Sequence, residues 1–473
     1  MGQRIKGEHL FLIFALVFGM LLVFLTPPMN APDENVHFLN AYGISRGNFF
    51  GEVVDGCHVR EIPAEIDAFE KEYSTRFTGN YDNKMAYKDI LAGTEKQESL
   101  DGTVWRKDVA SPMGYLVSGA GMAIGSLFGN RPYNLMIFGR IANLLFFVAI
   151  TFYALKITPC FKRTMLLIAM MPMTLFLAAS LSYDAVLIPV TFLFFAIVCR
   201  LMRRRDEVIQ RGEIVTVLFC VFFLVGVKQA YAPFLLMLLA IPKKKYGSSR
   251  NMGICIGLVA GVAILAYIPH FVFQRISASA VSAEDAAALQ GQAEWIGGHM
   301  LQLPKIFWTT FARANGYVES FWGKLGLLDT ALPKPLMVIG LLMIAGTAVF
   351  ETCSTSCFGS KEWWKRLLPV FAVAVSVVGI MYTMYKVYTP LPSVAAIIGG
   401  DAVVGFQGRY LIPVFLPFCL AFSNRLASSA ARRLKMDAAK CSLIKSRLDG
   451  VVWFWAFLCG VFTVLFVFLR YWV

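Results

Sequence analysis

Charged residues are scarce in this sequence: Asp, Glu, Lys and Arg make up 16% of the 473 residues, whereas hydrophobic residues make up 57%. The mean hydropathy is +0.62. So few charges cannot cover the surface of a water-soluble globular protein, and that class is excluded. The composition predicts an all-α polytopic membrane protein. Its net charge of +14 then reflects basic cytoplasmic loops, and no nucleic-acid partner is expected.

Several sequence features that would indicate other chemistry are also missing. There is no internal repeat, Walker motif or nucleotide-binding glycine loop, so no nucleotide is expected to supply energy on this chain. The five histidines lack metal-ligand spacing. Of the ten cysteines only Cys57 falls clearly in an outer loop, so no disulfide is expected within such a loop. Cys353 and Cys357 have no neighbouring histidine, and no metal site is expected there.

The first apolar run, Phe11 to Leu25, nearly suffices to span a bilayer. It leads into Pro27 and Pro28 without a small-residue cleavage site, so we expect a retained span. Basic residues before it predict a cytoplasmic N-terminus, and the later basic loops stay cytoplasmic only if residues 112–128 lie in the interface instead of crossing. About eleven spans follow. They are residues 11–25, 133–155, 165–180, 185–200, 214–227, 230–241, 253–273, 336–350, 367–385, 410–422 and 451–468.

These spans divide the chain into five parts. We expect a first transmembrane helix in 1–26, a large extracytoplasmic loop with juxtamembrane helices in 27–132, and a helical core in 133–273. A second extracytoplasmic loop is expected in 274–335. The C-terminal helices follow in 336–473, with a basic cytoplasmic loop at 425–450. Residues 214–241 are short for two crossings, which predicts a hairpin whose tip at Lys228 reaches only part of the way out.

The stretch after the first span places Asp33, Glu34 and His37 beside the membrane. Prolines hold this segment extended, and ionisable groups at such a boundary are functional candidates. The alternative is a solvated interfacial loop. Further polar residues are expected on the same outer face; they are Arg140, Tyr183, Asp184, Lys228, Tyr231, Gln407, Arg409 and Tyr410.

Separated acids and cations on one face suit an enzyme that takes a phosphate-linked lipid donor. A cation neutralises the leaving phosphate, and a carboxylate deprotonates the acceptor hydroxyl. Each residue also has a simpler explanation. Asp184 could be a helix cap, Lys228 could extend from a helix end, and Arg140 or Arg409 could pair with a lipid headgroup or the backbone.

The order Pro-Asp-Glu-x-x-His after the first span resembles a family of bacterial membrane proteins catalogued as domain of unknown function 2142. Similar motifs follow in order up to residue 413. They are Ala179-Ser180-Leu181-Ser182-Tyr183-Asp184, Lys228-x-x-Tyr231, Gly323-x-x-Gly326-x-x-Asp329-x-x-x-Pro333 and Gly405-Phe406-Gln407-Gly408-Arg409-Tyr410-Leu411-Ile412-Pro413. That family looks like the GT-C class of membrane glycosyltransferases, which take a sugar from a polyprenyl-phosphate carrier and use an acid in the first outer loop.

The resemblance implies roles for the candidate residues. Asp33 would be the catalytic base, with Glu34 supporting it or binding the acceptor, although the sequence alone does not decide which of the two is the base. Lys228 and Arg409 would hold the donor phosphate, and Tyr231, Gln407, Tyr410 and Arg140 are grouped with that site. His37, Tyr183 and Asp184 would line the cavity. The class includes metal-dependent members, but no compact outer acidic cluster is evident, so no metal cofactor is favoured.

The expected function is therefore an inverting glycosyltransferase of the bacterial cytoplasmic membrane, with its active site on the extracytoplasmic face. Its partners would be a polyprenyl-phosphate-linked sugar, an envelope glycan or lipid-linked acceptor, and membrane lipids. Two alternatives remain. One is a polysaccharide polymerase or ligase, which would rely on paired arginines in a later loop. The other is a lipid-linked-sugar transporter or flippase, which would need broken helices near the middle of the membrane.

Overall fold

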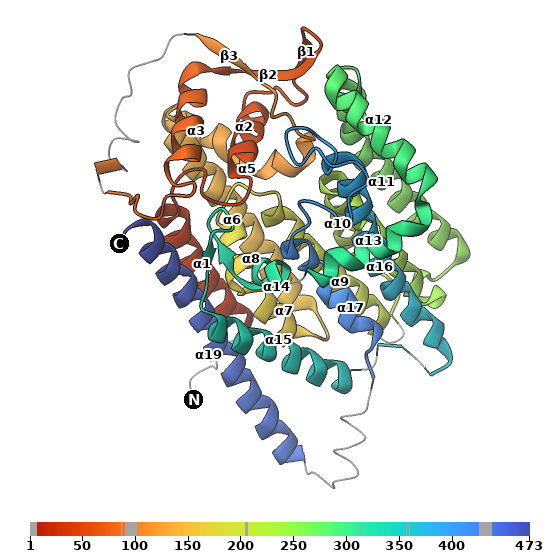
Figure 1. Cartoon of the computed structure of the whole chain (residues 1–473). Helices are drawn as coiled ribbons and strands as arrows, with labels where there is room; N and C mark the ends of the chain where they lie inside the picture. The colour runs from red at the N-terminus through yellow and green to blue at the C-terminus, as the bar shows by residue number, and fades with distance from the viewer. Residues whose placement is uncertain are drawn as a thin grey trace.

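The computed structural model of the chain describes residues 7–86, 88–89, 102–203, 207–313, 315–355, 357–358, 360–424 and 438–473. Most of these residues are helical (Figure 1). The α-helices are α1 (Gly7–Leu25), α2 (Glu34–Ser45), α3 (Ala64–Arg76), α5 (Leu116–Gly125), α6 (Pro132–Ile157), α7 (Lys162–Ala169), α8 (Pro172–Ala178), α9 (Asp184–Arg203), α10 (Arg211–Val227), α11 (Ser249–Ala278), α12 (Ala283–Gly298), α13 (Leu303–Ala312), α14 (Asn315–Trp322), α15 (Lys334–Ser354), α16 (Leu367–Thr383), α17 (Phe415–Ala421) and α19 (Ala438–Tyr471).

Short helical turns and strands connect these helices. The turns are η1 (Pro112–Tyr115), η2 (Ser126–Phe128), η3 (Gln229–Ala240), η4 (Lys243–Tyr246), η5 (Met300–Gln302), η6 (Ser360–Arg366), η7 (Met384–Tyr388) and η8 (Gly408–Leu411). The strands are β1 (Glu52–Val54), β2 (Cys57–Pro63), β3 (Thr103–Arg106), β4 (Lys324–Leu325) and β5 (Thr330–Ala331).

Within the described residues, seven helices are long and apolar enough to cross a membrane. Each has at least 18 residues, and 18 residues at 1.5 Å per residue extend about 27 Å, close to the hydrocarbon thickness. The chain is therefore a multi-pass membrane protein. The seven are α1, α6, α9, α11, α15, the continuous segment 362–388 around α16, and α19.

The remaining predicted spans are shorter than expected. Residues 165–180 form no single helix: α7 and α8 meet at a break before Pro172, where the missing N–H of proline suits a helix start. Residues 410–422 form only η8 and the seven-residue α17. All of α8 and most of α7 and α17 are buried in protein. Hydropathy does not distinguish such buried helices from helices that face lipid. Of the eleven predicted spans, seven coincide with helices long enough to cross a membrane in the described residues.

The predicted short hairpin is present in residues 211–240. Helix α10 has 17 residues, about 26 Å, and η3 is a 3₁₀-helix of 12 residues, about 24 Å at its larger rise. Lys228 lies at the junction in an extended conformation (φ −151°, ψ 100°). A 3₁₀-helix this long is unusual, and η3 packs against both α10 and α16.

A small cap, defined here as α2, α3, α5 and the sheet β1-β2-β3, covers one end of the helical core (Figure 1). Strand β2 pairs antiparallel with both neighbours. Arg106 on β3 binds Asp67 and Glu70 of α3, with N–O distances of 2.5 and 2.8 Å, and so joins sheet to helix.

Residues 112–128 belong to this cap. Helix α5 has ten residues, about 15 Å, which is too short to cross a bilayer. Its glycines allow close packing on α6: a Cβ at Gly121 would lie 2.5 Å from the carbonyl oxygen of Phe138. This geometry supports an interfacial position for 112–128.

Candidate functional site

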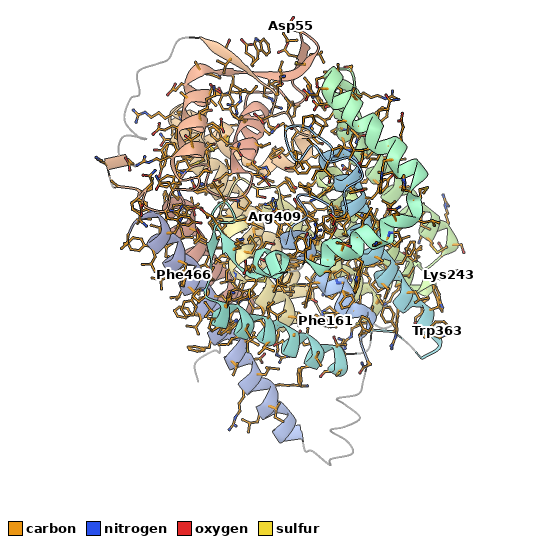
Figure 2. All side chains as sticks on the ribbon, in the orientation of Figure 1. Asp55, Phe161, Lys243, Trp363, Arg409 and Phe466 are labelled. Carbon is orange, nitrogen blue, oxygen red and sulfur yellow. The ribbon has the colours of Figure 1, made fainter. Side chains whose placement is uncertain are left out.

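Seven of the candidate side chains meet where the cap joins the helical core. They come from the start of α2, the start of α9, the α10–η3 junction and η8. The residues are Asp33, His37, Tyr183, Asp184, Lys228, Arg409 and Tyr410. Figure 2 shows Arg409 in the interior, between Asp55 in the cap and Phe161 at the opposite end.

Asp33 is the exposed member of the group. It immediately precedes α2 in a left-handed conformation (φ 58°, ψ 18°), which non-glycine residues rarely adopt. Its carbonyl accepts the first hydrogen bond of that helix, from the amide of His37 at 3.0 Å. The Asp33 side chain is 56% exposed, and its carboxylate is ion-paired with Arg409. The local backbone thus directs one carboxylate out of the protein, with a buried guanidinium behind it.

Arg409 lies beneath Asp33 with only 2% of its side chain exposed. Its Nη1 is 3.7 Å from Oδ2 of Asp184, which begins α9 and is itself buried. Among the described residues, Nε and Nη1 of Arg409 have no hydrogen-bond partner. A fixed guanidinium fork with unfilled N–H groups matches the oxygens of a phosphate or carboxylate.

Lys228 supplies a second cation beside Arg409. Its Nζ donates to the Tyr183 hydroxyl at 3.4 Å and lies 3.9 Å from the ring centroid of Tyr410, a cation–π contact. Burial lowers the pKa of Lys228 to about 8; the nearby Asp184 carboxylate opposes this shift, and the positive charge of Arg409 adds to it. The ammonium is thus held by aromatic faces and has no carboxylate salt bridge of its own within the described residues.

His37 forms the inner wall of the site. Its Nδ1 is 3.0 Å from the Tyr115 hydroxyl, and its ring lies edge-on to Tyr183 with centroids 5.3 Å apart. Burial, assisted by the charges of Arg409 and Lys228, lowers the pKa of His37 to about 4, against the opposing effect of Asp33. The imidazole is therefore neutral near pH 7. Tyr115 was not among the predicted site residues. Its only sequence signal is its place in Ser-Pro-Met-Gly-Tyr at the start of the 112–128 stretch.

The Tyr231 side chain and the main-chain oxygen of Gln407 hold η8 in position, since each forms a hydrogen bond with the backbone of Tyr410. The Tyr231 hydroxyl donates to the main-chain oxygen of Tyr410 at 2.8 Å and is almost fully buried. Oε1 of Gln407 is buried, without a hydrogen-bond partner among the described residues. The next residue, Gly408, donates its N–H to Ser320 at 2.9 Å, and a Cβ there would lie 1.8 Å from the carbonyl oxygen of Tyr317. Only glycine therefore fits at position 408, where the backbone of η8 packs directly against α14.

Glu34 and Arg140 do not belong to the exposed part of the site, contrary to expectation. Both side chains are fully buried and face each other, with Nε–Oε1 and Nη2–Oε2 distances of 2.8 and 2.6 Å. The Glu34 carboxylate also accepts the main-chain N–H groups of Ala31 and Leu181. The hydrogen bonds of the Glu34 carboxylate are therefore all made inside the protein, away from the surface on which Asp33 is exposed.

All five N–H groups of Arg140 are occupied. Two bind Glu34, and the other three donate to carbonyl oxygens where α1 ends, those of Val23, Thr26 and Pro27, at 2.7–3.0 Å. The expectation that Arg140 binds a donor phosphate is therefore wrong for this structure. The Glu34–Arg140 pair fixes the turn between α1 and α2, and it thereby sets the position of Asp33.

The two aspartates of the site face the same arginine. Asp33 and Asp184 each approach Arg409. Within the described ranges, the one cluster of three or more His, Cys, Asp or Glu side chains close enough to share an ion consists of cysteines elsewhere in the fold.

Comparison with known proteins identifies the family. A family model described as predicted membrane protein (DUF2142) matches residues 16–417, which include every residue of the site. No curated protein and no solved structure matches the chain. The match covers most of the chain and agrees with its multi-pass helical structure. The chain therefore belongs to the family of predicted membrane proteins catalogued as domain of unknown function 2142.

Proposed function

We propose that the protein is a GT-C-type glycosyltransferase that moves a sugar from a polyprenyl-phosphate donor to an envelope glycan or lipid-linked acceptor. The observation that carries the proposal is an ion pair at the surface of the site, in which the exposed carboxylate of Asp33 contacts the buried guanidinium of Arg409. Lys228 adds a second cation nearby. A transferase of this kind needs a base for the acceptor and positive charge for the leaving phosphate.

The proposed reaction is a single displacement at the anomeric carbon. Asp33 accepts the proton of the acceptor hydroxyl while that oxygen forms a bond to the anomeric carbon. The bond from this carbon to the phosphate oxygen breaks, and the polyprenyl phosphate leaves with the electron pair. Arg409 and Lys228 stabilise its negative charge, and attack opposite the leaving group inverts the anomeric configuration.

The Asp33–Arg409 ion pair suggests how donor binding prepares the base. Burial alone would raise the pKa of Asp33, but the positive charges of Arg409 and Lys228 outweigh it and hold this pKa below its usual range. A carboxylate with a low pKa is a weak base. When the donor phosphate engages Arg409, Asp33 loses this partner, so its pKa rises and its basicity increases. No metal ion is required for this step.

The proposed orientation places the cap and the site on the extracytoplasmic side of a bacterial cytoplasmic membrane. Lys243 of the basic loop lies toward the end of the molecule away from the cap (Figure 2). Basic loops stay preferentially in the cytoplasm, which supports a cytoplasmic N-terminus and an outward-facing site. The donor's prenyl chain would then remain in the outer leaflet while its phosphate reaches Arg409.

The test is sugar transfer by purified protein in nanodiscs, supplied with polyprenyl-phosphate sugars and extracted envelope glycans. We expect Asp33→Asn to abolish transfer. The matched control is Asp401→Asn, because Asp401 also pairs with an arginine, Arg313, but on the exposed surface. Folded Asp33→Asn protein with undiminished transfer would contradict the proposal. Saturable lipid binding without transfer by the wild type would favour a carrier instead.

A further inference from the structure

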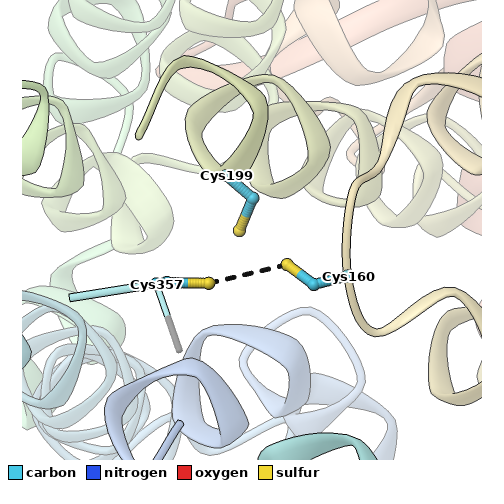
Figure 3. A group of neighbouring side chains, drawn as sticks. All are labelled: Cys160, Cys199 and Cys357. Carbon is cyan, nitrogen blue, oxygen red and sulfur yellow. Dashed lines mark hydrogen bonds between the residues drawn. The ribbon is translucent and has the colours of Figure 1, made fainter. Parts of the chain in front are cut away.

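Three cysteine side chains from different segments of the chain converge on one point in the fold (Figure 3). Cys160 lies between α6 and α7, Cys199 on the last turns of α9, and Cys357 after α15. Their Sγ atoms all lie within 4.8 Å of one another, and those of Cys160 and Cys357 are 3.7 Å apart. The three residues are far apart in the sequence, so only the fold brings them together.

The segments that carry these cysteines are fixed by other contacts. The hydroxyl of Thr158 donates to the carbonyl oxygen of Cys160 at 2.6 Å. Nη1 of Arg203, at the end of α9, donates to the carbonyl oxygen of Pro159 at 2.7 Å. The Glu351 carboxylate of α15 accepts the first N–H groups of α7, including that of Thr164 at 3.0 Å. The segments that carry Cys160 and Cys199 are therefore held by contacts outside the thiol group, and α15, which precedes Cys357, is anchored to α7.

We propose that Cys160, Cys199 and Cys357 bind one thiophilic d¹⁰ ion, Cu⁺ or Zn²⁺, as three thiolates. An ion with bonds of about 2.3 Å to three sulfurs separates them by roughly 3.8–4.0 Å. The Cys160–Cys357 separation is already close to this value and no pair is more than 4.8 Å apart, so side-chain adjustments of at most about 1 Å complete the site. Soft sulfur ligands select such ions over hard, oxygen-seeking ones.

Binding releases three protons, one from each thiol, and leaves a complex with net charge −2 for Cu⁺ or −1 for Zn²⁺. The guanidinium of Arg203 is close enough to interact with the Cys357 thiol and offsets part of this charge. In the described part of the chain, no fourth His, Cys, Asp or Glu joins the group. Zn²⁺ normally takes four ligands, so three sulfurs alone favour Cu⁺.

Other buried cysteines of the chain provide a comparison for the three-cysteine group. Cys220 and Cys459 are also buried, but each lies outside any such group in the described ranges, as expected for a small hydrophobic side chain. The site was not evident from the sequence, in which Cys353 and Cys357 are the pair that lies close along the chain. The structure pairs Cys357 with distant residues instead.

The bound ion would join three segments that are distant in the sequence. It would tie the α6–α7 turn to the end of α9 and to the segment after α15, next to the contact between Glu351 and α7. This role is independent of the proposed glycosyl transfer, since the cysteines lie away from Arg409, at the end of the molecule where Phe161 is found (Figure 2).

The test uses the full-length protein, purified under reducing conditions and stripped with a chelator. Cu⁺ is added in competition with a colorimetric Cu⁺ ligand, and Zn²⁺ and Cd²⁺ are added separately, with ultraviolet thiolate-to-metal absorption as the readout. We expect one ion per chain, tighter retention of Cu⁺ than of Zn²⁺, and a metal-dependent rise in Tm. Single substitutions Cys160→Ser, Cys199→Ser and Cys357→Ser should each abolish stoichiometric retention.

The matched control is Cys220→Ser, which removes a buried thiol without touching the group and should leave metal binding intact. Size-exclusion profiles verify that each variant is folded. Three results would overturn the proposal. They are no stoichiometric binding of any of the three ions, metal binding that survives when Cys160, Cys199 and Cys357 are all replaced by serine, or a Cys160–Cys357 disulfide in protein isolated from cells without reductant.

Discussion

At the residue scale, two adjacent carboxylates have opposite environments. Asp33 is exposed and ion-paired with Arg409, whereas Glu34 is fully buried and paired with Arg140. The sequence identified the acidic pair and its place after the first span. It could not separate the two residues, because the left-handed turn at Asp33 and the five acceptors around Arg140 arise only from tertiary packing.

This difference predicts that substitutions at Glu34 and Asp33 change the free energy of unfolding by different amounts. Glu34→Gln leaves the buried Arg140 charge uncompensated and should cost about 3–5 kcal/mol of unfolding free energy. Asp33→Asn also removes a carboxylate from a buried arginine, but Asp33 is mostly exposed and Asp184 still faces Arg409, so the loss of stability should be smaller. Thermal unfolding of both variants in the same detergent checks this. Equal Tm values for the two variants would show that the Glu34–Arg140 pair does not stabilise the turn.

His37 predicts a pH dependence of stability. Its pKa falls from 6.5 to about 4 on folding, mainly through burial, so between these values the unfolded state binds more protons. The stability it contributes is fully present above about pH 6.5 and is lost as the pH falls toward 4, by about 3 kcal/mol in total. The Tm difference between wild type and His37→Gln should shrink across this range. His299→Gln, at an exposed histidine, serves as the control, and a difference independent of pH would contradict the prediction.

Lys228 predicts a pH dependence of activity. Its ammonium has a pKa lowered to about 8, chiefly by burial, so the free protein loses this charge above that pH. We expect kcat/KM for the phosphate-linked donor to fall on the basic side near pH 8. Lys228→Arg should move this fall to higher pH, since arginine keeps its charge. If kcat/KM fell at the same basic pH in wild type and Lys228→Arg, Lys228 would not be the group that binds the donor phosphate.

At the scale of elements, the strongly apolar stretches were located correctly, but their roles were not all evident. The hairpin of α10 and η3 was recognised because it is too short for two full helices. Helices α7, α8 and α17 are each shorter than a full span, and composition does not distinguish a helix buried by other helices from one buried by lipid. The expectation that 112–128 lies in the interface followed from the distribution of basic loops, which is a property of the whole chain.

The contact between η8 and α14 gives a prediction at this scale. Gly408→Ala places a Cβ against the main-chain oxygen of Tyr317, so η8 must shift and carry Arg409 with it. We expect a loss of roughly 1–3 kcal/mol in stability and reduced donor binding. Gly346→Ala in α15, where nothing lies within 4 Å, is the matched control and should be neutral or slightly stabilising. Unchanged donor binding in a folded Gly408→Ala protein would contradict this packing account.

At the scale of the whole molecule, the cap, the hairpin and η8 meet at one site although they are distant in sequence. Part of this meeting could be predicted, since each candidate was assigned to the outer ends of apolar segments. The contribution of Tyr115 and the structural use of Arg140 could not, because nothing local distinguishes them from other tyrosines and arginines. The same limit hid the three-cysteine group.

The central claim is that Asp33 acts on the acceptor while Arg409 and Lys228 hold the donor phosphate. The most direct measurement is a single-turnover transfer rate together with donor affinity, for wild type and Asp33→Asn in nanodiscs. We predict that Asp33→Asn binds the polyprenyl-phosphate sugar at least as tightly as wild type, because Arg409 is released, but transfers it about 100- to 10,000-fold more slowly. Transfer within tenfold of wild type, from a folded and donor-bound variant, would contradict the account.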